Sequence, residues 1–154
     1  MTPYGRTTFG NPSSPVRVSA DGHPEYKPGG VAIDWSTVAP AAADVTLDTY
    51  VEIPSGQRGL RYGTVIAEIT ATGLYGPYDD GASDGRQTLT RGACYILDQT
   101  VLELGSIAGI PGRATNHPAV IEGGLVWRDR LVIGGDGPSQ SDFNAAFPRI
   151  RFAQ

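Results

Sequence analysis

The sequence predicts a mainly β fold because it is rich in Gly and Pro, the two residue types that interrupt helices. Gly and Pro together supply 33 of the 154 residues, 21 and 12 respectively. Because Gly costs about 1 kcal/mol and Pro about 3 kcal/mol in a helix interior, long helices have no room to form. The two longest stretches free of both, residues 41–53 and 93–104, contain several β-branched and apolar residues typical of strands. We therefore expect one compact β-rich body over residues 31–154, with one short C-terminal helix.

Residues 1–30 predict an extended N-terminal arm. They contain five prolines among Gly, Ser and Thr, and few apolar residues. Such a segment buries too little apolar surface to order itself, and fully extended it spans roughly 100 Å. Within it, residues 15–19 alternate apolar and polar side chains, as a short edge strand does when it adds to another protein's sheet. The alternative is an unattached tail that carries a chance alternation.

The body is expected to begin with strands over residues 45–53, 63–70 and 93–104. These segments are rich in Val, Ile, Thr and Tyr and are bounded by Gly or Pro. The stretch between the second and third strands, centred on residues 73–85, carries Gly, Pro and Asp at high density. That composition predicts a long acidic loop rather than a further strand.

Two later strands, over residues 118–122 and 125–133, are expected to form a hairpin through Gly123-Gly124. A Gly pair suits a tight turn that needs positive φ. The connection between this hairpin and the preceding strand, residues 105–116, reads as a loop. The positions assigned to structural turns are Gly63, Gly73, Asp84, Gly85, Gly92, Gly123 and Gly124.

One short helix is expected near the C-terminus. Ser139 or Ser141 can cap it, Asp142 lies in its first turn, and Phe143 and Phe147 are four residues apart and so share one face. Residues 149–152 alternate again and predict a last strand that would close the sheet.

Composition narrows the range of partners and compartments. A net charge of −4 argues against nucleic acid as a partner. No apolar run approaches the length of a membrane span and no signal peptide is visible, so we expect a protein made in the cytosol without a membrane partner. Cys94 is the only cysteine and lies in an apolar strand, where a small buried hydrophobic residue is expected.

The candidates for chemistry are few. His23 and His117 each precede a proline in a segment that reads as loop, and neither has a clear partner. In the acidic loop, a helix-loop-helix calcium site opening at Asp80 is excluded, because its third and twelfth positions would be Ala82 and Arg91. A looser calcium site remains open, but aspartates that hold turn backbones are the simpler interpretation. We therefore expect no catalytic residue, no metal, no cofactor and no enzymatic activity.

Glycine placement and strand order also carry a family resemblance. The runs GTVIAEI, TGLYGPYDDGASDG, TRGACYILDQTV and PAVIEGGLVWRDRL occur in this order and, over roughly residues 45–152, the chain resembles the lambda-type head decoration proteins of tailed bacteriophages. The resemblance implies a tulip- or barrel-like β body that forms a homotrimer at threefold or quasi-threefold positions and stabilises the shell. It further implies that the arm adds to the major capsid protein on the outer surface of the virion. The arm residues expected to bind the capsid are Tyr4, Arg6, Phe9, Val16, Arg17 and Val18.

Two other functions stay open. A carbohydrate- or receptor-binding β-sandwich would use aromatic side chains as a stacking platform, whereas a small β-fold enzyme would gather His117 with an aspartate of the acidic loop. The first needs exposed, coplanar rings, and we favour simple loop packing for the two loop tyrosines. The aromatic candidates are Tyr75, Tyr78, Trp35 and Trp127, and the acidic candidates are Asp79, Asp80 and Asp84.

Overall fold

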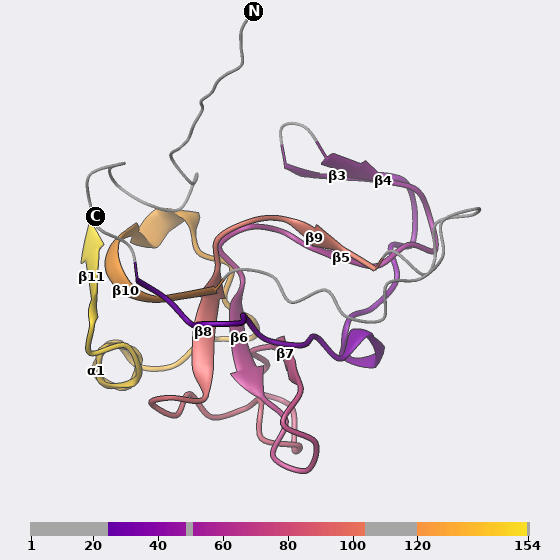
Figure 1. Cartoon of the computed structure of the whole chain (residues 1–154). Helices are drawn as coiled ribbons and strands as arrows, with labels where there is room; N and C mark the ends of the chain where they lie inside the picture. The colour runs from indigo at the N-terminus through magenta and orange to yellow at the C-terminus, as the bar shows by residue number, and fades with distance from the viewer. Residues whose placement is uncertain (1–24, 49–50, 104–119, 154) are drawn as a thin grey trace, which may run out of the picture.

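The computed structural model describes residues 25–48, 51–103 and 120–153, and these form a mainly β protein with one α-helix near the C-terminus (Figure 1). The predictions of a mainly β fold and of one short C-terminal helix are therefore confirmed. The strands are β2 (Glu25–Tyr26), β3 (Val45–Asp48), β4 (Val51–Ile53), β5 (Gly59–Leu60), β6 (Val65–Glu68), β7 (Tyr75–Pro77), β8 (Cys94–Leu97), β9 (Val101–Leu102), β10 (Val120–Trp127) and β11 (Ile150–Ala153). The helix is α1 (Gln140–Ala146), and two short 3-10 turns are η1 (Trp35–Thr37) and η3 (Arg128–Arg130).

A six-stranded sheet forms the centre of the body, in the order β11-β10-β8-β6-β7, with β2 also paired to β10. The β6–β8 and β8–β10 pairs are antiparallel, whereas β10–β11 is parallel. The sheet is open, with β11 and β7 at its two ends, so the barrel-like closure that the resemblance implies is not present among the described strands.

Two predicted strands are divided in the structure. Residues 45–53 form a hairpin, β3 paired with β4, rather than one strand. Residues 93–104 divide into β8, which belongs to the central sheet, and β9, which pairs with β5 in a separate two-stranded sheet. The break falls at residues 98–100, where Asp98 accepts a hydrogen bond from the Tyr26 hydroxyl and Thr100 accepts one from the Tyr62 backbone N–H. Polar side chains used in this way end a strand without Gly or Pro.

The predicted hairpin through Gly123-Gly124 is wrong, because β10 is one continuous strand that includes this Gly pair. The pairing of β10 with β2 shifts register between Ile121 and Gly123, which is the signature of a β-bulge. Gly124 has φ of 126°, and a side chain at Gly123 would collide with Glu25. The first half of β10 therefore pairs with β8 and β2, and its second half pairs with β11.

Part of the predicted acidic loop is also a strand. β7 pairs antiparallel with β6, and on its other side Tyr75 forms a parallel bridge with Ile33. Gly76 lies against Thr37 and Arg86, with no space for a Cβ. Gly76 therefore allows close packing against η1 and does not form a turn. For this reason the high Gly content of residues 73–85 wrongly predicted a loop at β7.

The C-terminal helix is confirmed. The Ser139 hydroxyl caps α1 by accepting a hydrogen bond from the Asp142 backbone N–H at 3.1 Å. Phe143 and Phe147 lie on the buried face with ring centroids 5.1 Å apart, and Phe152 of β11 lies 4.8 Å from Phe143. The aromatic cluster thus joins α1 to the last strand, which also forms as expected.

Alternation along the central strands divides the core into two clusters, one on each face of the sheet. Along β8, Cys94 and Ile96 belong to the cluster beneath α1, whereas Tyr95 and Leu97 belong to the opposite cluster. β6 alternates in the same way, with Ile66 on the second face. Both faces of the central strands are therefore covered, which explains why β8 is buried along its whole length.

Cys94 is buried, as expected, and burial raises its pKa to about 12. Because only the thiolate reacts readily with disulfide reagents, we expect Cys94 to react many times more slowly at pH 8 in the folded protein than in denaturant. The unfolded thiol ionises near its ordinary pKa of about 8.5, so raising the pH above that value should favour the unfolded state. Absorbance assays with a chromogenic aromatic disulfide would measure both rates, and equal rates would contradict the assigned burial.

Candidate functional site

The first described strand, β2, falls within residues 1–30, the segment predicted as an arm, and it pairs with the body. β2 lies antiparallel to β10, with Tyr26 opposite Ile121 and Glu25 opposite Gly123. The Lys27 backbone N–H donates to the Val120 carbonyl at 3.1 Å. The Tyr26 hydroxyl donates to an Asp98 carboxylate oxygen at 2.6 Å, which ties β2 to the end of β8 as well. We call Glu25, Tyr26 and Lys27 the arm root.

A single arginine holds the arm root against the last strand. The Arg149 guanidinium lies 2.5 Å from a Glu25 carboxylate oxygen and 3.3 Å from one of Glu122. The side chains of Arg149 and Glu25 are about half exposed, so each pair is worth at most about 1 kcal/mol. Their value lies in geometry, because one guanidinium joins β2, β10 and the start of β11.

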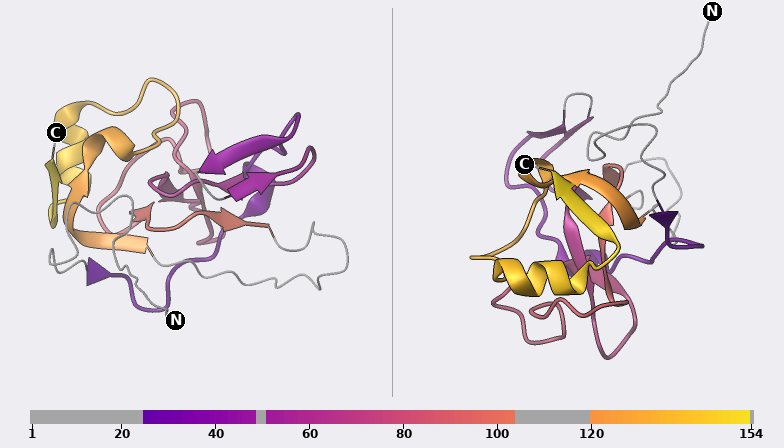
Figure 2. Two further views of the ribbon diagram at one scale, coloured as in Figure 1. Left: turned by 90° about the horizontal axis from the view of Figure 1, so that it is seen from above. Right: turned by 90° about the vertical axis from the view of Figure 1, so that its left-hand side faces the viewer.

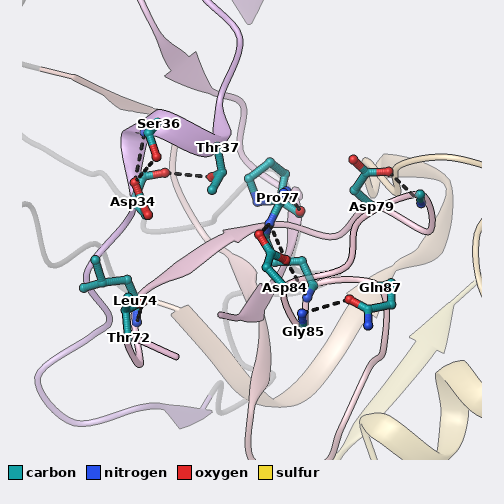
Figure 3. A network of polar contacts seen from close by, with 12 residues as sticks. Asp34, Ser36, Thr37, Thr72, Leu74, Pro77, Asp79, Asp84, Gly85 and Gln87 are labelled. Atoms are coloured by element: carbon teal, nitrogen blue, oxygen red, sulfur yellow. Dashed lines mark hydrogen bonds and ion pairs between the residues drawn. The ribbon is translucent and has the colours of Figure 1, made fainter. Parts of the chain in front are cut away.

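The acidic loop uses its carboxylates to hold its own turns (Figure 3) and, through Asp80, the turn at residues 134–138. Asp79 accepts a hydrogen bond from the Gly81 backbone N–H at 2.9 Å, and Asp80 accepts one from the Asp136 backbone N–H at 2.9 Å. Burial alone would raise the pKa of Asp84, but hydrogen bonds from the backbone and guanidinium of Arg86 outweigh it and lower that pKa below its usual value. Among the described residues no group of three or more His, Cys, Asp or Glu could hold a metal ion.

The two loop tyrosines do not form a stacking platform. Tyr75 and Tyr78 are 6% and 4% exposed, and Tyr75 packs at 5.7 Å from Tyr95. Desolvation by burial raises the pKa of both hydroxyls. Trp35 packs against the second core cluster, and the Arg130 guanidinium lies 5.5 Å from the Trp127 ring. The preference for packing over ligand contact at Tyr75 and Tyr78 is therefore supported by their burial.

The described surface of the body has several hollows, and two of the larger ones have different linings. One of about 540 Å³ lies between α1 and the segment 87–91. The other, of about 390 Å³, lies below the β3–β4 hairpin and is lined by Leu47, Leu60, Val65 and Val132 among others. Val132, which lines this hollow, and Val45 of β3 are the exposed large hydrophobic residues of the described chain. The second hollow is thus apolar, and the hairpin forms one of its walls.

The predicted site residues fall into two groups. All the arm residues expected to bind the capsid, together with His23 and His117, lie outside the described residues. Sequence reasoning missed the arm root and Arg149, because residues 25, 122 and 149 come together only through the pairing of distant strands. Five of the Gly positions assigned to turns have positive φ, namely Gly63, Gly73, Gly85, Gly92 and Gly124.

No protein-family model, no curated protein and no solved structure matches this chain. Within the described part of the chain, no helix has both the length and the apolar character needed to cross a membrane.

Proposed function

We propose that this chain is a structural virion protein of a tailed bacteriophage. It binds the outside of the capsid as a homotrimer at threefold or quasi-threefold positions and stabilises the shell. The N-terminal arm adds to the major capsid protein, and the β body stands on the outer surface. The resemblance of residues 45–152 to head decoration proteins motivates this proposal, and the mainly β character of the body supports it.

The single observation that favours an arm is the arm root. A tether transmits force to a body only if its attachment point is fixed. Here Tyr26 and Glu25 are held by a strand ladder, by the Tyr26–Asp98 hydrogen bond and by the Arg149–Glu25 ion pair. The residues ahead of Glu25 therefore start from a defined position on the body, next to the beginning of β11.

The arrangement also suits weak individual contacts. Three arms on one trimer make the second and third contacts effectively intramolecular, at local concentrations of roughly mM. A segment as short as residues 15–19 can then attach a body stably, even though one isolated strand addition is weak.

Deletion of residues 1–24, which keeps the arm root, is expected to leave a folded body that no longer binds capsids. The reason is that both core clusters are built from residues after Tyr26. Circular dichroism and thermal unfolding would check the fold, and co-sedimentation with undecorated capsids would measure binding. A truncated body that binds as well as the full chain would overturn the arm assignment.

Two full-length variants make the test specific. Val16→Asp combined with Val18→Asp places charges at the apolar positions of the alternating segment, and we expect it to reduce capsid binding. Ser13→Ala combined with Ser14→Ala alters the same arm outside that segment and should bind as the unmodified chain does. Equal binding by both variants would show that the alternating segment does not carry the contact.

A further inference from the structure

Several sheet edges of this body have no further strand beside them among the described residues, and those of β11 and of the β3–β4 hairpin differ in charge. β11 pairs on one side only, with β10. The β3–β4 hairpin forms a sheet of its own, so the outer edges of both its strands are open. An unpaired edge presents a row of backbone donors and acceptors that can pair with another chain.

These two edges carry opposite charge. Residues 44–53, which contain the hairpin, hold three acidic residues and no Lys or Arg, and the side chains of Asp44 and Glu52 are exposed. Residues 149–153, which contain β11, hold no Asp or Glu and two arginines, of which Arg149 is already paired with Glu25 and Glu122, so Arg151 supplies the positive charge of this edge. Arg151 is exposed, on the opposite face of β11 from the buried Ile150. Charges of one sign on an edge keep like edges apart, but here the two kinds of edge attract each other.

The edges lie at opposite ends of the molecule. Figures 1 and 2 show β11 at one side of the body and the hairpin standing out at the other. One copy cannot bring its own two edges together, whereas a row of copies can. Such a contact joins different surfaces on the two copies. It gives a closed ring when the rotation that relates each copy to the next adds up to a full turn.

We propose that the β3–β4 hairpin of one copy docks on the β11 edge of the next copy, head to tail, with Glu52 of one copy facing Arg151 of the other. This inference deepens the self-association included in the proposed function and names the surfaces that make it. Each edge is only three or four residues long, so a single contact is weak. The contact is also between exposed charges, so it weakens as salt screens them.

Sedimentation velocity without capsids tests the proposal. The unmodified chain should self-associate in low salt at protein concentrations up to about 1 mM. At 1 M salt, where the screening length is about 3 Å, the dissociation constant of self-association should rise by roughly tenfold or more. Glu52→Arg alone and Arg151→Glu alone should each weaken association by at least the same factor. The exposed Ala71→Glu, in the turn between β6 and β7, adds a carboxylate outside both edges, so it is the matched control and should associate normally.

Two recombinations separate a direct contact from a general charge effect. A chain with both Glu52→Arg and Arg151→Glu should associate again, because the attraction is restored with its signs reversed. An equimolar mixture of the two single variants should also associate, although neither does alone. Failure of both recombinations, or a monomeric unmodified chain at all concentrations, would overturn this inference. Capsid binding, measured separately by co-sedimentation, decides the proposed function independently of that result.

Discussion

Phe143→Ala is expected to lower the free energy of unfolding by about 3–5 kcal/mol, the usual cost of removing a buried aromatic ring. Phe143 is fully buried between Phe147 and Phe152, with ring centroids 5.1 and 4.8 Å away. The Arg128 guanidinium lies 5.0 Å from the same ring. Truncation therefore removes contacts to α1, β11 and η3 at once and leaves a cavity where they meet.

Urea-induced unfolding followed by tryptophan fluorescence would measure this effect. Asn144→Ala is the matched control, because Asn144 is exposed on the same helix and its side-chain oxygen accepts a hydrogen bond from the exposed Gln140 side chain. We expect the control to change the free energy by less than about 0.5 kcal/mol. Similar losses in both variants would mean that α1 is not held by its aromatic face.

Gly63→Ala is expected to destabilise the protein by about 2–5 kcal/mol in total. Gly63 has φ of 84°, a conformation that costs an L side chain about 1–2 kcal/mol. A Cβ there would also collide with the Arg130 carbonyl oxygen, which is backbone and cannot turn away. Displacing that backbone adds roughly 1–3 kcal/mol and disturbs the Val132–Gly63 hydrogen bond beside it.

Gly73→Ala separates the two parts of this cost. Gly73 has φ of 73°, close to that of Gly63, but a Cβ at Gly73 meets nothing within 4 Å. We expect it to lose only the backbone part, about 1–2 kcal/mol. Thermal unfolding of both variants would measure the difference, and equal losses would show that the segment 130–131 yields freely to a side chain at Gly63.

Local signals explain which elements could be predicted from the sequence. The helix α1 has its cap at Ser139, an acidic first turn and two phenylalanines on one face, all within nine residues. The segment that forms β6 is bounded by glycines and rich in β-branched residues. Neither element depends on a distant partner for its type, so sequence alone was enough for both.

The wrong predictions share a different cause. A Gly pair suits a hairpin turn and the inside of an irregular strand equally. Gly123-Gly124 lies within β10, directly after a register shift, because β2 and β11 bring Glu25 and Ile150 to the same strand. Those partners lie far away in the sequence. The candidate site was missed for the same reason, since Arg149 meets Glu25 only after both strands have paired with β10.

The pairing of β2 with β10 also has a consequence for folding order. Tyr26 opposite Ile121 closes a loop of 95 residues, whereas Val126 opposite Phe152 closes one of 26. Because loop-closure entropy grows with length and β2 is only two residues long, β2 is the last strand expected to form, and under a pull that exceeds what its contacts withstand it is the first strand expected to open. Release of β2 leaves the buried residues of both core clusters in place, and Val31 is the next buried residue along the chain. In the proposed attachment, local opening then adds residues 25–30 to the tether, roughly 20 Å when extended, so the body could move by that distance without unfolding.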